Sequence, residues 1–172
     1  MEFFDTYEHA FKSLKFTADI VYNIDETGVS TVVQSHNIVV QIGMKQVGQA
    51  VSVEREAVIT VCMIIISFRS TVPPVLISPT ARLRESLMFG APPRSLGLVY
   101  SPQRSWITGL LFLRAVEHAK KYTRSSKEDR IILLMDSHES HCTLDSVLYT
   151  RENGTTLVTF LPTALIGYRH WM

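Results

Sequence analysis

Two aspartates in this 172-residue chain each come directly after a short apolar segment that predicts a buried strand. Asp25 follows residues 20–24, and Asp136 follows residues 131–135. If the two strands are parallel neighbours, both carboxylates emerge at the same edge of a sheet and can share a divalent cation. Oxygen ligands of this kind suit Mg²⁺ or Mn²⁺, and paired acids support metal-assisted phosphodiester chemistry. The alternative is that each aspartate caps the turn or helix that follows its strand.

A second polar group, His-Glu-Ser-His at 138–141, follows the Asp136 strand. Its histidines are three residues apart, whereas the zinc-protease motif places them four apart on one helix face. The spacing therefore favours a hydrogen-bonded loop over a zinc site. Neither Cys62 nor Cys142 has a CxxC partner, and a nucleophilic pair of Cys142 with a histidine is the alternative that the sequence leaves open.

The elements that must position these residues follow from hydrophobic periodicity and from Pro and Gly. The expected helices span residues 1–16, 107–122 and 144–152; the expected strands span 19–24, 32–41, 58–66, 131–135 and 156–161, with a turn at 25–28. The strand at 58–66 lacks alternation, which is typical of a strand covered on both faces. Residues 67–105, interrupted by prolines, predict an irregular segment that wraps the domain. Strands alternating with helices towards the end of the chain indicate an α/β domain with parallel pairing.

Length and composition exclude several classes of protein. The chain is 46% hydrophobic, enough for the core of one domain, and 19% charged, too little for a disordered chain. Its longest apolar run, residues 57–66, is about half of a membrane span, and its acidic N-terminus is unlike a signal peptide. Two cysteines form no disulfide framework and fit a reducing compartment.

The net charge of +1 hides an uneven distribution. Residues 1–68 carry a net charge of −4, residues 69–130 carry +7 and residues 131–172 carry −2. A basic region beside acidic motifs can hold a polyanion next to a metal site, although a solvated face is the plainer interpretation. The candidate nucleic-acid contacts in the basic region are Arg104, Lys120, Lys121 and Arg124.

Several motifs resemble one family when they are taken together. They include Asp-Glu-Thr-Gly at 25–28, Lys-Gln-Val-Gly at 45–48, Gly-Ala-Pro-Pro at 90–93, Trp-Ile-Thr at 106–108, Asp-Ser-His-Glu-Ser-His at 136–141 and Glu-Asn-Gly at 152–154. In this order they resemble the DDE endonuclease domain of pogo, Tigger and jerky-type transposases, a family that includes centromere protein B. The resemblance runs from about residue 3 to residue 162, and it is specific as a set rather than by any single motif.

The resemblance implies a ribonuclease-H-like α/β fold. This fold has a mixed sheet of about five strands flanked by helices, here a single domain over 1–172 that is incomplete at the C-terminus, with an atypical tail at 163–172. It implies that Asp25 and Asp136 are the first two catalytic acids and ligands of Mg²⁺ or Mn²⁺, and that Glu26, His138 and His141 are adjacent to the site. It further implies a nuclear protein with DNA as its partner, no membrane and no small-molecule cofactor.

One departure from the family pattern bears directly on activity. The family's third catalytic acid corresponds to about position 172, which is Met172, and no Asp or Glu follows Glu152. We therefore expect impaired catalysis, whereas the motif set and the basic middle segment predict weak, non-specific DNA binding. Two alternatives stay open: an active Mg²⁺-dependent endonuclease in which Glu26, Glu139 or Glu152 supplies the third carboxylate, and a non-enzymatic remnant or protein-interaction module.

Overall fold

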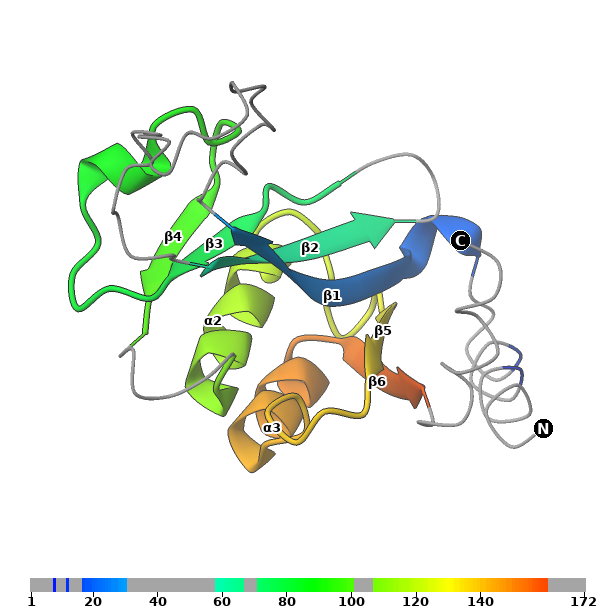
Figure 1. The fold of residues 1–172 in the computed structure, drawn as a ribbon. Coiled ribbons are helices and arrows are strands. Elements are labelled where there is room, and N and C mark those ends of the chain that lie inside the picture. Colours follow the sequence, from blue (N-terminus) through cyan, green and yellow to red (C-terminus); the bar gives the residue numbers. More distant parts are fainter. Residues whose placement is uncertain are drawn as a thin grey trace, which may run out of the picture.

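The computed structural model describes Glu8, Lys12 and residues 17–30, 58–66, 71–100 and 107–160. Of Phe160, only the backbone is described. These residues form a six-stranded sheet in the order β4-β3-β2-β1-β5-β6, with helices on one face (Figure 1). The strands are β1 (Val21–Ser30), β2 (Val58–Ile66), β3 (Val75–Ser78), β4 (Leu96–Val99), β5 (Ile131–Asp136) and β6 (Thr155–Phe160). The helices are α2 (Gly109–Lys120) and α3 (Leu144–Glu152), with short 3-10 helices η1 (Ala18–Ile20) and η2 (Glu85–Met88).

The sheet is mixed, and β1 lies at its centre. β1 pairs antiparallel with β2 from Tyr22 opposite Ile66 to Ser30 opposite Val58, and parallel with β5 on its other side. β2 and β3 are antiparallel, whereas β3 with β4 and β5 with β6 are parallel. The expected turn at 25–28 is wrong, because the long ladder with β2 satisfies the backbone of β1 as far as Ser30.

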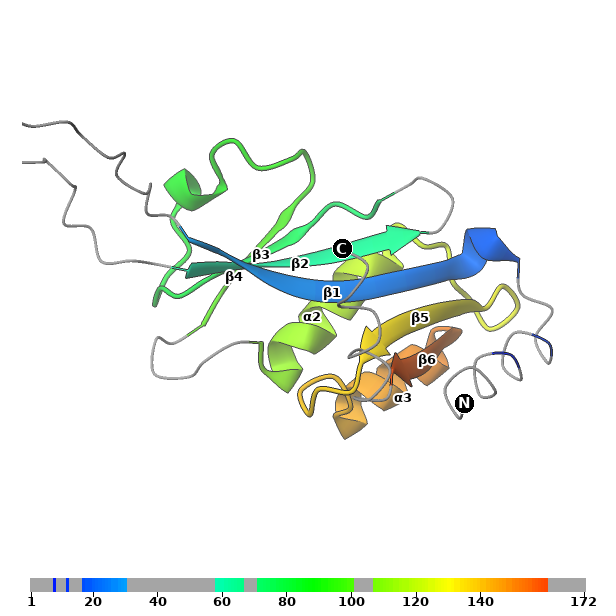
Figure 2. The same ribbon diagram turned by 45° about the vertical axis from the view of Figure 1, so that its right-hand side comes forward.

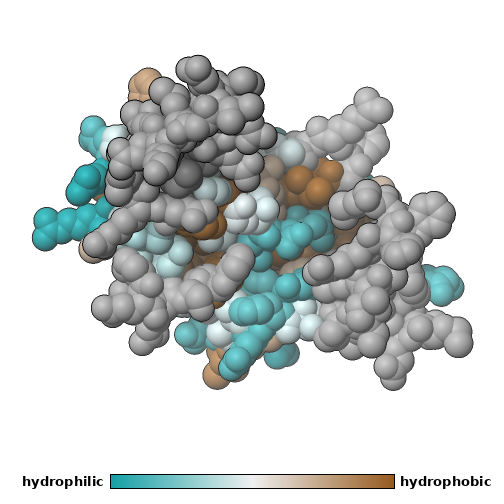
Figure 3. Space-filling model, in the orientation of Figure 1, coloured by the Kyte–Doolittle hydropathy of each residue, from teal (hydrophilic) through white to brown (hydrophobic). Residues whose placement is uncertain are grey.

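One face of the central strands carries the core. In β2, Thr60, Cys62 and Ile64 are buried, while Met63 and Ile65 are 38% and 44% exposed. Among the described residues, the expectation that this strand is covered on both faces is therefore wrong. Buried and exposed side chains alternate along β2, but the residues on both faces are mostly apolar, so the sequence does not reveal the alternation. Figure 2 shows α2 and α3 on the same side of the sheet. In Figure 3, hydrophobic surface (brown) lies beside hydrophilic surface (teal) in the region of β1 and β2.

Helix α2 supplies the centre of this core. Its Phe112 and Ala115 are fully buried and belong to the same hydrophobic cluster as Ile24 of β1 and Met135 of β5. Thr108 begins α2 by accepting a hydrogen bond from the backbone N–H of Leu111 at 3.4 Å, as an N-cap residue does. The helices expected at 107–122 and 144–152 are confirmed as α2 and α3, and the strands expected at 58–66 and 131–135 are confirmed as β2 and β5. The strand expected at 156–161 is confirmed over its described residues, 156–160.

Two parts of the sequence prediction need a different account. The segment expected to be irregular contains β3, η2 and β4, whose strands of four residues are too short for a periodic signal. In the expected helix at 1–16, Glu8 and Lys12 are helical and form an ion pair one turn apart. The strand expected at 32–41, Arg104 and the tail at 163–172 lie outside the described residues. In the described part of the chain, no helix is long and apolar enough to cross a membrane.

His118 of α2 makes a pH-dependent contribution to stability. The side chain is 4% exposed, and its Nε2 lies 2.9 Å from the carbonyl oxygen of Pro73. Burial lowers the pKa of His118 below its ordinary value of 6.5, so the unfolded chain binds this proton more readily than the folded one. The free energy of unfolding therefore falls as the pH drops below the unfolded value.

We expect His118→Gln, which can still donate to the Pro73 carbonyl, to flatten the fall in Tm between about pH 7 and pH 5. Thermal denaturation of both proteins across this range measures the difference. A variant whose Tm fell as steeply as that of the original protein would contradict the assignment.

Candidate active site

Asp25 and Asp136 lie level with each other on neighbouring parallel strands. The β1–β5 register runs from Val21 opposite Ile132 to Asn23 opposite Leu134, and the same offset places Asp25 beside Asp136. Asp136 is the last residue of β5, while β1 continues past this point. The structure therefore brings together the two acids that the sequence singled out, at the edge where β5 ends.

Both acids line an open cleft with a cavity volume of about 320 Å³. The cleft is also lined by Glu26, Thr60, Ile107, His138 and His141. Of the three carboxylates considered as a substitute third acid, Glu26 is in this cleft, whereas Glu139 and Glu152 do not line it. Among the residues that the structure describes, no three His, Cys, Asp or Glu side chains are grouped so that they could hold one metal ion.

The carboxylate of Asp25 is held by its own strand. Its Oδ1 accepts a hydrogen bond from the backbone N–H of Glu26 at 2.9 Å. Burial raises the pKa of Asp25, and the negative charges of Glu26 and Asp136 raise it further. A divalent cation between these acids would act in the opposite direction, because it stabilises the ionised form.

His141 is the most enclosed polar residue of the cleft. It is 2% exposed, and its ring stacks on Phe112 of α2 with centroids 4.4 Å apart. Its Nε2 lies 3.2 Å from Oε1 of Glu26 and its Nδ1 lies 2.6 Å from Oδ1 of Asp136. Neither contact has the angle of a hydrogen bond, so the ring is held between two charges. Burial alone would lower the pKa of His141, but the two carboxylates outweigh it and the pKa is raised.

Glu26 reaches His141 because of its position in the ladder. Glu26 pairs with Cys62, whose side chain is fully buried, so the Glu26 side chain points to the same face of the sheet as α2. The neighbouring Asp25 pairs with the exposed Met63 and belongs to the other face. The Glu26 side chain is 11% exposed, and its Oε1 makes no hydrogen bond with a described residue. The sequence named Glu26 and His141 as neighbours of the site, but their contact depends on this register.

The loop after β5 holds Asp136 by backbone contacts. The N–H of His138 donates to Oδ1 of Asp136 at 3.0 Å, and Nδ1 of His138 lies 2.8 Å from the Ser140 hydroxyl. The N–H of His141 donates to the His138 carbonyl at 2.9 Å. The expectation of a hydrogen-bonded loop here is confirmed.

The cysteines do not form a nucleophilic site with these histidines. Cys62 is fully buried, and burial, together with the charges of Glu26 and Asp25, raises its thiol pKa far above the ordinary value. Cys142 is exposed and is not part of the cleft lining. Thiolate chemistry therefore has no support in this geometry.

Three of the four candidate basic residues are described by the structure, and they lie away from the cleft. Ile107, just before α2, lines the cleft, whereas Lys120 ends α2 and is followed by Lys121 and Arg124. A helix of 12 residues is about 18 Å long. The structure therefore does not bring these three candidate nucleic-acid contacts to Asp25 and Asp136.

The fold of this chain is similar to that of Mos1 transposase in several solved structures. A pre-cleavage Mos1 transpososome matches with a TM-score of 0.52 and 10% identity, over 98% of this chain and 47% of that one. The Mos1 strand transfer complex matches with a TM-score of 0.50 and 12% identity, over 96% and 46%. The Mos1 paired-end complex with the left transposon end matches with a TM-score of 0.50 and 10% identity, over 92% and 40%.

These matches confirm a ribonuclease-H-like α/β fold of the transposase type, with six described strands where about five were expected. The chain spans less than half the length of the solved structures that it matches. No protein-family model matches the sequence, and no curated protein matches it.

Proposed function

We propose that this chain is a transposase-derived, nuclear DNA-binding domain that binds one divalent cation at Asp25 and Asp136 and does not cut DNA. The observation that carries the proposal is the level position of these two acids on adjacent parallel strands in a transposase-like fold. The names of the matching structures, which include a paired-end complex with a transposon end, support DNA as the partner.

The donor set supports a hard cation such as Mg²⁺ or Mn²⁺. Asp25 and Asp136 offer carboxylate oxygens to one cleft, and oxygen ligands of this kind are the ones that such cations prefer. Asp25 and Asp136 would hold the ion, which would supply positive charge to phosphate oxygens. The backbone N–H groups of Glu26 and His138 keep the two carboxylates oriented in its absence.

The donor set of the described residues supports the absence of cleavage. Among these residues, no three His, Cys, Asp or Glu side chains are grouped so that they could hold one metal ion. Two metal ions about 3.5–4 Å apart clamp the attacking and leaving oxygens in two-metal phosphodiester chemistry, and two carboxylates hold such a pair poorly. Losing several kcal/mol of this stabilisation lowers the rate by about tenfold for every 1.4 kcal/mol.

Two measurements test the proposal. Mn²⁺ binding, followed by electron paramagnetic resonance, should be weak, with about one ion per chain, and should be lost in Asp25→Asn and in Asp136→Asn. Glu139→Gln, which removes an exposed carboxylate from the adjacent loop, should bind Mn²⁺ like the unmodified protein. Supercoiled plasmid should stay uncut in Mg²⁺ or Mn²⁺. Mn²⁺ binding that survived both aspartate substitutions would refute the proposed site.

The second candidate is an active endonuclease in which Glu26 serves as the third carboxylate. It is favoured by the position of Glu26 in the same cleft as Asp25 and Asp136. Under this alternative, plasmid is nicked in Mg²⁺, and nicking disappears both in Asp25→Asn and in Glu26→Gln.

A further inference from the structure

Lys and Arg side chains without an ion-pair partner among the described residues lie at the end of the sheet opposite the cleft. They lie just before β4, after α2, before β5 and at the end of α3, where the parallel strands begin. We call this set the basic edge; it consists of Arg94, Lys120, Lys121, Arg124, Lys127, Arg130 and Arg151. All but Lys120 are exposed, and within the described ranges none of them forms an ion pair. Among the described residues that flank the strands and helices at this end, the acids are fewer: Asp19, Glu128, Asp129 and Glu152.

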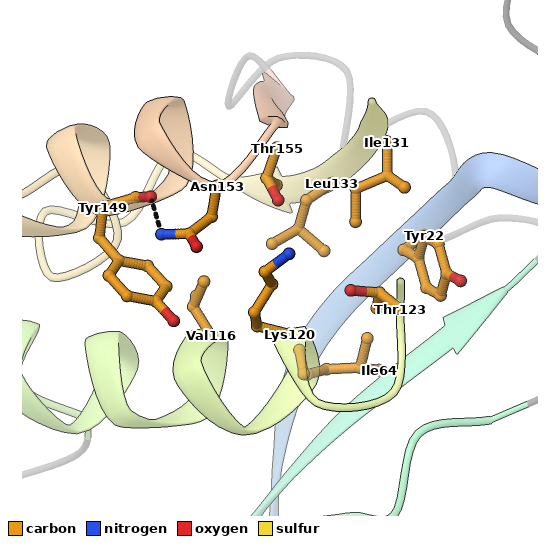
Figure 4. A pocket seen from close by; sticks show the side chains of 11 residues that line it. Tyr22, Ile64, Val116, Lys120, Thr123, Ile131, Leu133, Tyr149, Asn153 and Thr155 are labelled. Carbon is orange, nitrogen blue, oxygen red and sulfur yellow. Dashed lines mark hydrogen bonds between the residues drawn. The ribbon is translucent and has the colours of Figure 1, made fainter. Parts of the chain in front are cut away.

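Packing contacts join the segments of the basic edge into one surface. The Tyr122 hydroxyl donates to the Arg94 carbonyl at 3.5 Å, which links the end of α2 to the start of β4. Gly154 lies so close to the Ser126 carbonyl that there is no room for a Cβ, which links the 121–130 loop to the start of β6. Lys120 and Asn153 line one small cavity at this end of α2 (Figure 4). The backbone segments that carry these cations are therefore packed against one another.

A hollow in this surface offers two arginines to one ligand. Arg130 and Arg151 line a hollow of about 520 Å³, together with residues 154–157 of the β6 segment. Its openness to solvent suits an extended ligand rather than an enclosed small molecule. Arginine donates in a planar fork that matches the geometry of phosphate oxygens.

The charge distribution separates this surface from the cleft. Asp25, Glu26 and Asp136 line the cleft, no Lys or Arg is among its described lining residues, and the length of α2 separates it from the basic edge. Without a bound cation, the carboxylates of the cleft repel a polyanion, whereas the basic edge attracts it, and each phosphate bound there releases condensed counterions.

We propose that the phosphate backbone of duplex DNA binds to the basic edge, with Arg130 and Arg151 as its central contacts. This inference rests on the DNA binding proposed above. DNA held there would occupy a site separate from the divalent cation, so its binding would not require that ion.

Fluorescence anisotropy of the full chain with a labelled 20-base-pair duplex, in EDTA and over a series of KCl concentrations, tests the inference. Each lost phosphate contact makes the slope of log K against log salt shallower by about 0.9, so Arg130→Gln/Arg151→Gln should lose about 1.8. Arg130→Lys/Arg151→Lys keeps the charges and should keep the slope. Arg82→Gln/Arg84→Gln removes two exposed arginines outside the basic edge and should bind like the unmodified protein.

The outcomes separate the two proposals. If the unmodified chain binds the duplex with salt dependence but Arg130→Gln/Arg151→Gln keeps its slope, or if Arg82→Gln/Arg84→Gln loses as much, the basic edge is not the DNA surface. If the unmodified chain shows no salt-dependent binding, the proposed DNA-binding function fails together with this inference. Circular dichroism melts of the variants establish that the exposed substitutions leave the fold intact.

Discussion

Replacing His141 by Gln is expected to lower the free energy of unfolding by about 3 kcal/mol, because it removes one partner from a buried group of charges. The ring lies between Glu26 and Asp136 and stacks on Phe112, so its loss leaves two carboxylates facing each other and a gap against α2. The expected loss is at the lower end of the range for buried pairs, since Asp136 is 37% exposed and its charge is partly screened. Urea denaturation in EDTA near pH 6 measures it.

The pH dependence of this loss identifies the charged ring as its cause. The pKa of His141 in the folded protein is raised above 6.5, so its stabilisation is complete below that unfolded value. It is lost as the pH rises through the folded value. The difference between the unmodified protein and His141→Gln should therefore shrink as denaturation is repeated at increasing pH.

Two further variants serve as controls. Glu26→Gln/His141→Gln removes the partner charge as well and should recover part of the stability that His141→Gln loses. His138→Gln changes the exposed histidine of the same loop and should cost well under 1 kcal/mol. If the double variant lost the simple sum of the two single effects, the charges of Glu26 and His141 would not be coupled.

Replacing Gly154 by Ala is expected to cost about 3 kcal/mol of unfolding free energy. Gly154 has a φ of 69°, and a Cβ at this position would lie 1.7 Å from the Ser126 carbonyl oxygen. The left-handed backbone accounts for about 1 kcal/mol of the cost, and the rest comes from pushing the 121–130 loop away from β6. Thermal or urea denaturation measures the loss.

Gly90 provides the matched control for this prediction. Its φ is 78°, but no atom lies within 4 Å of the position that a Cβ would take. Gly90→Ala should therefore show the backbone cost alone, about 1 kcal/mol. Equal losses in the two variants would mean that the close contact between Gly154 and Ser126 does not contribute.

The regular elements of this protein were predictable where the local residue pattern was strong. The β-branched run of β2 and the apolar stripe of α2 each carry their own signal within a few residues. The end of β1 was not predictable in this way: the segment Asp-Glu-Thr-Gly at 25–28 is typical of a turn, and only pairing with β2, more than thirty residues later in the chain, keeps it extended. β3 and β4 were missed because strands of four residues among prolines leave no periodic pattern.

The same distinction applies to the sites. The sequence by itself determined that two aspartates follow apolar strands, and that the middle of the chain carries the excess positive charge. Only the tertiary structure decided that Asp25 and Asp136 lie level, that His141 lies between Glu26 and Asp136, and that the cations collect at the opposite end. Strand register and helix crossovers bring together residues that are far apart in the chain, and these depend on the hydrogen bonding and packing of the whole sheet rather than on local residue pattern.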